Sequence, residues 1–253
     1  MSAFKDHFST GSAAYAAYRP TYPRALVDFL ADASPSTELA LDCGCGSGQL
    51  STLLAERFSR VIATDASAQQ IANAEPHANV EYRVAPAEAS GLPDGSADLV
   101  TAAQAAHWFD LPAFYAEARR VARPGGIVSL VTYGVIEMDE PVHAVVRRFY
   151  RDVVGPYWPP ERRHVEEGYR AFGFPFEEFP APPLDIAVAW TLNELSGYAE
   201  TWSATRAAEK ALGREPVERF RQALAQAWGE PEMRHTVRFP LSLRVGRSKV
   251  TNR

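Results

Sequence analysis

A glycine-rich turn after a short apolar segment limits the folds open to this chain more than any other feature of its sequence. The apolar run that begins at Leu39 reaches Asp42, and glycines follow at positions 44, 46 and 48. This order predicts a buried strand that ends in a tight turn and leads directly into a helix. Glycines allow positive φ and the close approach of a ligand, and the start of a helix offers unpaired N–H groups. We therefore expect a nucleotide-like ligand at the carboxyl end of this strand.

The spacing of the glycines separates different kinds of ligand site. The dinucleotide fingerprint G-x-G-x-x-G, counted from Gly44, requires a glycine at position 49, where the chain has Gln49. The phosphate-binding loop requires a Lys followed by Ser or Thr, and no such pair occurs nearby. The remaining pattern of Asp42 with the three glycines resembles the first motif of class I S-adenosylmethionine (SAM) methyltransferases, whose ligand has no phosphate to neutralise. An ordinary tight turn in another α/β protein is the alternative.

The composition is that of an ordinary globular protein. Its 253 residues are enough for one large domain or for a core with a cap, and 46% of them are hydrophobic. The net charge of −5 gives no basic surface for nucleic acid, and we find neither a signal peptide nor an apolar run long enough to cross a membrane. We therefore expect no nucleic-acid partner, no membrane association, a cytoplasmic location and a monomer or homodimer.

The two cysteines, Cys43 and Cys45, both lie in the glycine turn. Because one residue separates them, they are poorly placed to form a disulfide, and there is no further cysteine to complete a zinc site. We expect them to act as small apolar residues in a reducing compartment, and we expect no metal.

Strand and helix patterns alternate from Leu39 to Tyr133. Strands separated by helices of this length form a parallel sheet with right-handed crossovers. Arg123-Pro124-Gly125-Gly126 is expected to break the chain between the last helix and the fifth strand. The expected strands are Leu39–Cys43, Val61–Thr64, Val80–Val84, Asp98–Ala103 and Ile127–Tyr133, and the expected helices are 50–58, Ser67–Ala74 and 111–121.

The pattern changes after Tyr133. Residues Gly134 to Asp185 contain eight prolines, which are excluded from the interior of regular helices and central strands, so we expect an irregular insertion draped over the sheet. Beyond it we expect a sixth strand, two amphipathic helical stretches and a final strand, at Ile186–Leu192, Ser196–Ala211, Val217–Trp228 and His235–Val245.

Two segments at the expected strand ends carry the polar groups of a ligand site. Asp65 follows the second strand, 19 residues after Gly46, where a carboxylate can accept both hydroxyls of a ribose; capping the next helix is the alternative. After the fourth strand, Gln104 can bind the amino-acid end of the cofactor. His107 can exchange a proton near neutral pH, and Trp108 can face a sulfonium cation. Simple packing of His107 against aromatic residues is the alternative.

An unusual run near the start of the chain joins tyrosines with an arginine. Pro20 and Pro23 end helical structure, which places Tyr18 and Arg19 at a bend. Arg19 is suited to a carboxylate such as that of a methionine group. A packing strap of tyrosines over the sheet is the alternative.

Together these segments resemble one branch of the class I methyltransferases, the trans-aconitate methyltransferase-like group. The resemblance covers roughly residues 4 to 245. It implies an α/β, doubly wound, mostly parallel seven-stranded Rossmann-like sheet with an antiparallel last strand, and SAM as cofactor. It also implies a single domain with its core at about 35–133 and 186–245 and a cap from 1–34, 134–185 and 193–230. The matching motifs are YAAYRPTYP (15–23), LDCGCGSG (41–48), ATD (63–65), APAE (85–88), DLVTAAQAAHWFD (98–110), RPGG (123–126), YWPPERRHVEEGY (157–169) and TWSATR (201–206).

The resemblance also assigns site residues. Many class I enzymes bind the adenine amino group with an Asp where this chain has Pro86, so a main-chain N–H near Ala87 and the carboxylate of Glu88 are the expected substitutes. The expected catalytic residues are His107 and Trp108. The expected cofactor contacts are Tyr18, Arg19, Asp42, Gly44, Cys45, Gly46, Gly48, Asp65, Ala66, Gln69, Ala87, Glu88, Gln104 and Ala105. The expected substrate contacts are Tyr15, Tyr133, Trp158, Arg162, Trp202 and Arg206.

The expected activity is methyl transfer from SAM to a small-molecule acceptor. Aromatic and basic residues of the cap, Tyr169 among them, suit a small carboxylic acid. A carboxylate oxygen is already ionised and needs no base, whereas a hydroxyl oxygen needs one, and His107 is the candidate. Alternatives for the cap residues are a solvated pair Arg162-Arg163 and a core position for Trp202. Alternative functions are a SAM-binding protein without transferase activity and a nicotinamide-dependent oxidoreductase.

Overall fold

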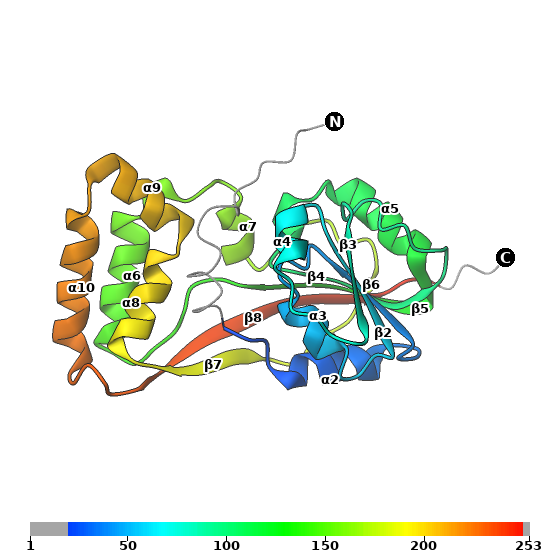
Figure 1. Ribbon diagram of the computed structural model, residues 1–253, viewed down its shortest axis with the longest axis horizontal. Helices are drawn as coiled ribbons and strands as arrows, with labels where there is room; N and C mark the ends of the chain where they lie inside the picture. The colour runs from blue at the N-terminus through cyan, green and yellow to red at the C-terminus, as the bar shows by residue number, and fades with distance from the viewer. Residues whose placement is uncertain (1–19, 250–253) are drawn as a thin grey trace.

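A twisted sheet with flanking helices forms one lobe of the molecule, and a group of helices forms the other (Figure 1). The structure is a computed structural model that describes residues 20–249. Three predicted site residues, Tyr15, Tyr18 and Arg19, lie outside the described residues. We call the two parts the sheet lobe and the helical lobe.

The main sheet runs in the order β3-β2-β1-β4-β5-β8-β6. Strands β1 to β5 are parallel, and β8 is antiparallel to β5. The doubly wound sheet with an antiparallel last strand is therefore confirmed. The strands are β1 (Leu39–Cys43), β2 (Arg60–Asp65), β3 (Val80–Val84), β4 (Ala97–Ala103), β5 (Ala122–Tyr133), β6 (Glu177–Glu178), β7 (Asp185–Trp190) and β8 (His235–Arg247).

Both faces of the central strands are buried, each against different helices. Side chains alternate between faces along a strand, so Ala40 and Leu41 belong to two separate apolar clusters. The cluster of Ala40 includes residues of α2 and α3, and the cluster of Leu41 includes residues of α5. Burial on both faces explains the nearly continuous apolar sequence of these strands. The helices of the sheet lobe are α2 (Arg24–Ala33), α3 (Gln49–Leu54), α4 (Ala68–Ala72) and α5 (Leu111–Val121).

One predicted boundary in the sheet lobe is wrong. The segment Arg123–Gly126 does not separate helix from strand, because β5 already begins at Ala122, which pairs with Ala97. The ladder then shifts register before Leu99 pairs with Ile127, and Gly125, at φ 78°, lies within this irregular stretch of β5. The guanidinium of Arg123, at the start of β5, donates a hydrogen bond to the carboxylate of buried Asp98 at 3.0 Å.

The proline-rich segment is more helical than its composition predicts. Pro141 precedes the first residue of α6 and Pro156 lies in the first turn of η3, positions that need no main-chain N–H. The prediction of an irregular insertion is therefore wrong for the residues between these prolines. The elements here are α6 (Val142–Arg148), the π-helix η2 (Phe149–Val153), η3 (Gly155–Tyr157) and α7 (Arg162–Glu166). Helix α7 packs on the sheet lobe through Val165, whereas the helical lobe also contains α8 (Leu192–Glu200), α9 (Ser203–Leu212) and α10 (Glu215–Trp228).

The long strand β8 connects the two lobes. Its last residues pair with β5 in the main sheet, whereas its first six residues, His235–Pro240, pair with β7 beside the helical lobe (Figure 1). The predicted sixth strand thus exists as β7, but it lies off the main path of the sheet. The long amphipathic stretch predicted at 196–211 is divided between α8 and α9, because the chain turns at Thr201–Trp202.

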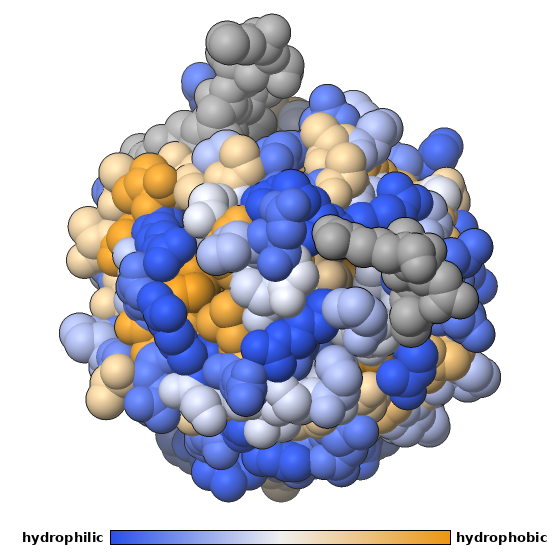
Figure 2. All heavy atoms as spheres, turned by 90° about the vertical axis from the view of Figure 1, so that its right-hand side faces the viewer, coloured by the Kyte–Doolittle hydropathy of each residue, from blue (hydrophilic) through white to orange (hydrophobic). Residues whose placement is uncertain are grey.

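The helices give no sign of a membrane-spanning protein: none within residues 20–249 is both long and apolar enough to cross a bilayer. Figure 2 looks at the end of the sheet lobe, where hydrophilic residues cover most of the face around a smaller apolar area.

Candidate active site

The glycine turn lies at the carboxyl end of β1 and contacts the loop that follows β4. Gly44 has φ 67°, and a Cβ placed on it would lie 2.5 Å from the Cβ of Ala105. The ring of Phe109 also comes close to this position, at 3.1 Å. Only glycine fits both the backbone conformation and the space. The predicted cofactor residues Gly44 and Ala105 are therefore brought together.

Asp65 holds the turn from the end of β2. One carboxylate oxygen accepts from the main-chain N–H of Gly46 at 2.9 Å, and the other accepts from that of Ser67 at 2.8 Å. Cys45 is fixed to the same strand, since its N–H donates to the carbonyl of Thr64 at 3.0 Å. Each carboxylate oxygen of Asp65 keeps a further lone pair for a ligand donor. The alternative role, capping the next helix, falls to Ser67, whose hydroxyl accepts from Gln70 N–H.

Asp42 is the second carboxylate beneath the turn, and it is 1% exposed. Its Oδ2 accepts from the hydroxyl of Ser51 at 2.6 Å. Its Oδ1 is buried, and within residues 20–249 it has no hydrogen-bond partner. Burial raises the pKa of Asp42 to about 7, the Ser51 hydrogen bond opposes the rise, and Asp65 adds to it. The site therefore has acceptors and negative charge, which suit a cationic ligand and disfavour a phosphate.

The loop after β3 is tied to the loop after β4. The carboxylate of Glu88 accepts from the main-chain N–H of Asp110 at 2.9 Å, and Asp110 caps α5. Ala87 beside it is buried. Two further predicted contacts, Ala66 and Gln69, are exposed after β2.

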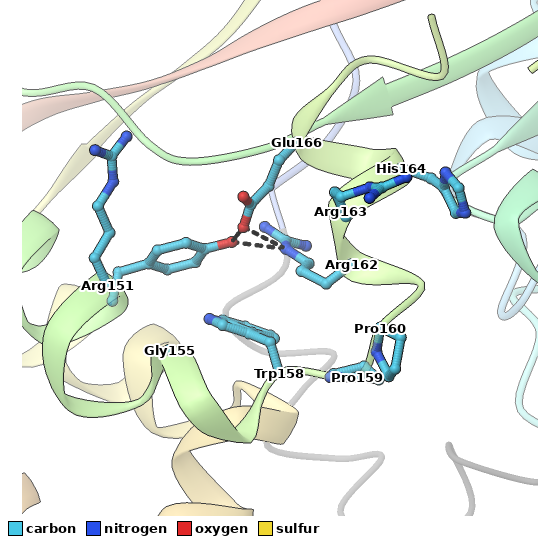
Figure 3. A pocket seen from close by; sticks show the side chains of 10 residues that line it. Arg151, Gly155, Trp158, Pro159, Pro160, Arg162, Arg163, His164 and Glu166 are labelled. Atoms are coloured by element: carbon cyan, nitrogen blue, oxygen red, sulfur yellow. Dashed lines mark hydrogen bonds and ion pairs between the residues drawn. The ribbon is translucent and has the colours of Figure 1, made fainter. Parts of the chain in front are cut away.

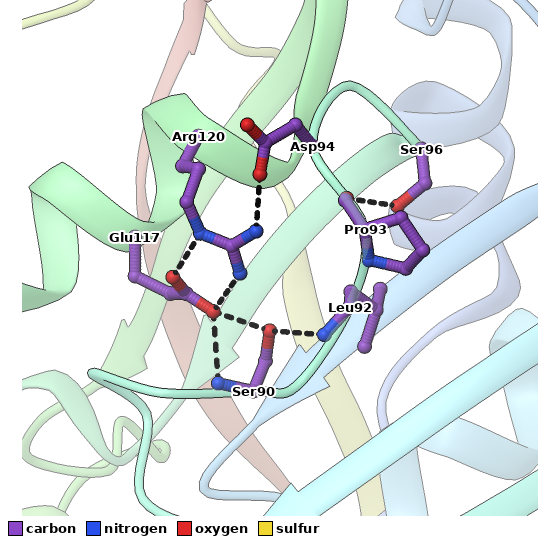
Figure 4. Close-up of polar contacts among 7 residues, drawn as sticks. All are labelled: Ser90, Leu92, Pro93, Asp94, Ser96, Glu117 and Arg120. Atoms are coloured by element: carbon purple, nitrogen blue, oxygen red, sulfur yellow. Dashed lines mark hydrogen bonds and ion pairs between the residues drawn. The ribbon is translucent and has the colours of Figure 1, made fainter.

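A buried carboxylate fixes the far end of this β3 loop (Figure 4). Glu117 of α5 accepts from the N–H and the hydroxyl of Ser90, at 2.8 and 2.6 Å, and it pairs with Arg120 at 2.8 Å. Arg120 also contacts Asp94 in the following turn. Burial opposes the charge of Glu117, but the bonds from Arg120 and Ser90 prevail and lower its pKa.

We expect Glu117→Ala to lower the free energy of unfolding by about 2–4 kcal/mol, because the Ser90 N–H and hydroxyl lose their partner in a buried place. Asp94→Ala is the matched control, since Asp94 pairs with the same arginine but its side chain is 80% exposed. It should cost less than about 1 kcal/mol. Urea unfolding measures both, and equal losses would contradict this account.

Both polar atoms of the Gln104 side-chain amide form hydrogen bonds within the protein. Its Nε2 donates to the carbonyl of Tyr133 at 2.9 Å, and its Oε1 accepts from the hydroxyl of Thr132 at 2.7 Å. One N–H remains for the predicted contact with the cofactor. Tyr133 takes part through its main chain, while its ring packs against Tyr22 and Phe239.

His107 lies in the short helix η1 (Ala106–Trp108) and is half-buried. Its Nδ1 is 2.8 Å from the hydroxyl of Tyr169, and its ring lies 4.8 Å from that of Trp108. Burial, followed by Arg162 and His164, lowers the pKa of His107 to about 3. The imidazole is therefore neutral at physiological pH and a weak base in the free protein; a bound anion would oppose the effect of Arg162 and His164 and raise its pKa.

Arg162 and His164 also line a cavity of about 810 Å³ (Figure 3). The guanidinium of Arg162 lies 4.8 Å from the ring centre of Trp158, and its Nε donates to the hydroxyl of Tyr150 at 2.8 Å. Tyr150 also donates to Glu166, the one acidic residue of the lining. The basic residues of the lining are Arg151, Arg162, Arg163 and His164.

Three predicted substrate residues, Tyr133, Trp202 and Arg206, do not line this cavity. Trp202 is 8% exposed and packs behind the wall, with its ring 5.3 Å from Tyr150 and 5.9 Å from Trp158. It therefore occupies the core position that was its alternative. Arg206 lies exposed on α9.

Three residues that position the site were not predicted in these roles. Tyr169 and Thr132 reach His107 and Gln104 from other elements, and Glu117 braces the β3 loop from α5. A Glu on a helix and a Thr in a strand resemble surface and core residues until the fold is known. No group of three or more His, Cys, Asp or Glu side chains suited to a metal occurs within residues 20–249.

Known proteins match both the sequence and the fold. The methyltransferase domain family matches residues 41–130, the segment from the glycine turn to β5. A Dictyostelium discoideum protein named as a methyltransferase is 35% identical over 229 residues, covering 89% of this chain and 87% of that protein. The structure of a protein named as a type II methyltransferase, from Anaeromyxobacter dehalogenans, is 50% identical with a TM-score of 0.88, covering 91% of this chain and 98% of that one. The chain therefore belongs to the class I SAM-dependent methyltransferases.

Proposed function

We propose that this protein transfers the methyl group of SAM to an oxygen atom of a small anionic acceptor. The observation that carries the proposal is the basic, aromatic cavity of Figure 3, two of whose lining residues, Arg162 and His164, act electrostatically on His107. His107 in turn belongs to the same loop as Ala105, which touches the glycine turn. The loop of His107 therefore contacts the glycine turn, and two residues of the cavity lie near enough to His107 to lower its pKa.

The residues of the turn fit SAM. The unpartnered, buried Oδ1 of Asp42 matches the ammonium group of a methionine moiety, and Asp65 offers lone pairs to ribose hydroxyls. Two carboxylates side by side suit a ligand with positive charge. When bound, SAM supplies a methyl group made electrophilic by its sulfonium.

The charge of the cavity lining is the reason for proposing an anionic acceptor. Three arginines and one acidic residue line it, so an anion gains from entering. Arg162 is held between the ring of Trp158 and the hydroxyl of Tyr150, which orients its guanidinium before the acceptor arrives. Such fixed positioning of two reactants can supply about 7–11 kcal/mol of barrier lowering.

The proposal is tested in two steps. Calorimetric titration with SAM and with NAD first distinguishes the cofactor site from that of a nicotinamide-dependent oxidoreductase. Release of S-adenosylhomocysteine is then measured with a panel of hydroxy acids, simple carboxylic acids and neutral alcohols of matched size. We expect SAM to bind and acids to react. SAM binding with no turnover across the panel, or turnover of the neutral alcohols alone, would contradict the proposal.

We expect Asp65→Ala to weaken SAM binding by roughly 10- to 100-fold, the equivalent of losing charge-assisted hydrogen bonds of about 1.5–3 kcal/mol. Part of the effect comes from the turn itself, since Gly46 and Ser67 lose their acceptor. Asp28→Ala, which removes an exposed carboxylate on α2, is the control. Unchanged affinity of Asp65→Ala in calorimetry would rule out the assignment of Asp65 to the ribose.

A further inference from the structure

Buried carboxylates are rare in this protein and are not all stabilised in the same way. Within residues 20–249, three acidic side chains are buried, those of Asp42, Asp98 and Glu117. An ionised carboxylate away from water is stable only where hydrogen bonds and an opposite charge replace its hydration. The three sites differ in whether the protein supplies that charge.

Two of the three carboxylates have an arginine as partner. Asp98 accepts from the guanidinium of Arg123 at 3.0 Å. Its oxygens also accept from one hydroxyl and two main-chain N–H groups, which belong to Ser36, Glu38 and Leu39. Glu117 accepts from the guanidinium of Arg120 through both of its oxygens, each at 2.8 Å. In both places a cation of the protein itself compensates the burial of the negative charge.

Asp42 is the buried carboxylate without such a partner. Its Oδ2 accepts from the hydroxyl of Ser51 at 2.6 Å, and its Oδ1 has no hydrogen-bond partner among the described residues. The charged group that acts on it is Asp65, which carries the same sign. The free protein therefore disfavours the ionised form of Asp42, while it stabilises the ionised forms of Asp98 and Glu117.

The other groups around Asp42 do not supply the missing charge. The residues beside it on β2 and β4, and the one that contacts it from α3, do not titrate in this range; they are Ala63, Thr101 and Ser51. Cys43 and Cys45 follow it in the turn, and Tyr82 lies on β3. Burial raises the pKa of both thiols, and it raises that of Tyr82 to about 12, so all three are neutral near pH 7. The pKa of Asp42, about 7, agrees with this arrangement.

We propose that binding of SAM expels a proton from Asp42, so that the protein binds its cofactor tightly near pH 7 and more weakly as the pH falls. The inference rests on the proposed function, in which the ammonium group of SAM meets this carboxylate. A positive charge within about 4–6 Å favours the ionised form. The cofactor thus brings the cation that Arg123 provides for Asp98.

The proton leaves to solvent. The O–H bond of the Asp42 carboxylic acid breaks, the electron pair stays on the carboxylate, and the carboxylate pairs with the ammonium group. The ammonium group keeps its own proton, because the ordinary pKa of an α-amino group is about 7.7–8.0 and an adjacent carboxylate favours its charged form. One proton is therefore released for each protonated Asp42 that binds SAM.

Acidification weakens the binding because it removes the competent form of the free protein. Only molecules with an ionised Asp42 bind SAM, so the apparent Kd rises as their fraction falls. With a pKa of about 7, half of the free protein is competent at pH 7 and about a tenth at pH 6. We therefore expect the affinity for SAM to fall about fivefold between pH 7 and pH 6.

Calorimetry counts the released protons directly. SAM is titrated into the protein at pH 6 in two buffers of different ionisation enthalpy, and the difference in heat gives the number of protons exchanged. We expect about 0.9 proton released for each SAM bound. S-adenosylhomocysteine has the same ammonium group without the sulfonium, so it should release the same amount.

Two variants assign the proton to Asp42. Asp42→Asn keeps the shape but has no ionisable group, so it should release no proton and bind SAM equally at pH 6 and pH 7. Ser51→Ala removes the hydrogen bond that favours the ionised form, so the midpoint of the pH dependence should rise by about one pH unit. Ser196→Ala is the matched control, because this buried serine donates to the carbonyl of Leu192 and should leave the midpoint unchanged.

Different results would overturn the inference and the proposed function. Wild-type protein that binds SAM at pH 6 without releasing a proton overturns the inference, and this measurement needs no variant to fold. Proton release that persists in a folded Asp42→Asn variant, or that occurs with SAM but not with S-adenosylhomocysteine, overturns it as well. Failure of the acceptor panel, by contrast, overturns the proposed function and leaves a measured proton release standing.

Discussion

Replacing His107 with asparagine is expected to lower kcat by about 10²–10⁴ with the best acceptor of the panel, the usual contribution of a general base. Asparagine keeps a polar group near the place of Nδ1 that can still contact Tyr169, but it has nothing at the place of Nε2. The affinity for SAM should change little, because no described contact of the glycine turn involves the imidazole.

His107→Gln and His77→Asn sharpen this test. Glutamine extends a polar group toward the place of Nε2 but is no base, so kcat should remain low. His77 is exposed, and its replacement should have no effect. Full activity in both His107 variants would assign His107 to the pocket wall alone.

The His107→Asn variant should also change how the free energy of unfolding depends on pH. The folded pKa of His107 is lowered to about 3, from an ordinary value of 6.5, by burial and then by Arg162 and His164. Between these values the unfolded chain binds a proton that the folded chain excludes. Stability is therefore highest above pH 6.5 and falls on acidification, by up to about 1.4 kcal/mol per pH unit. His107→Asn lacks this contribution, so it should lose less stability than the wild type between about pH 6.5 and pH 4.

Gly44→Ala is expected to weaken SAM binding by about 30-fold or more. The left-handed conformation costs about 1–2 kcal/mol for any other residue, and overpacking costs typically about 1–3 kcal/mol. Here the new Cβ would lie 2.5 Å from the Cβ of Ala105, so the turn after β1 and the loop after β4 must move apart. Both carry predicted cofactor contacts. Calorimetry with SAM measures the loss.

Two further variants separate the causes. Gly95 has φ 59°, and a Cβ added to it would meet no heavy atom within 4 Å. Gly95→Ala therefore introduces the conformational cost alone, far from the turn, and SAM should bind normally. Adding Ala105→Gly to Gly44→Ala removes the collision and should restore part of the affinity. No recovery in the double variant would show that the conformation of the turn, rather than its contact with Ala105, sets binding.

The sheet lobe was the most predictable part of the molecule from sequence. Strands β1 and β3 have the predicted bounds, and α4 begins directly after Ser67, where a helix start was predicted. Local signals suffice here, because a strand buried on both faces and a capped helix show themselves within a few residues. The family follows from the glycine turn for the same reason. The narrower trans-aconitate resemblance stays a prediction.

The helical lobe and the support of the site were harder to predict. Prolines signal breaks, and nothing local shows that Pro141 and Pro156 stand at helix starts. The contact of Tyr169 with His107 joins the turn after α7 to the loop after β4, two segments that are 62 residues apart in the chain. Trp202 and Trp158 have the same local character, and only packing places one in the core and the other on the cavity.

The strand β8 has a mechanical consequence for catalysis. Its thirteen residues form one continuous strand, paired at one end with β7 and at the other with β5. A large swing of the helices away from the sheet would have to break or shear these hydrogen bonds together, which resists local opening. We therefore expect entry of reactants to depend on smaller displacements of loops, with β8 limiting how far the two lobes can separate during turnover.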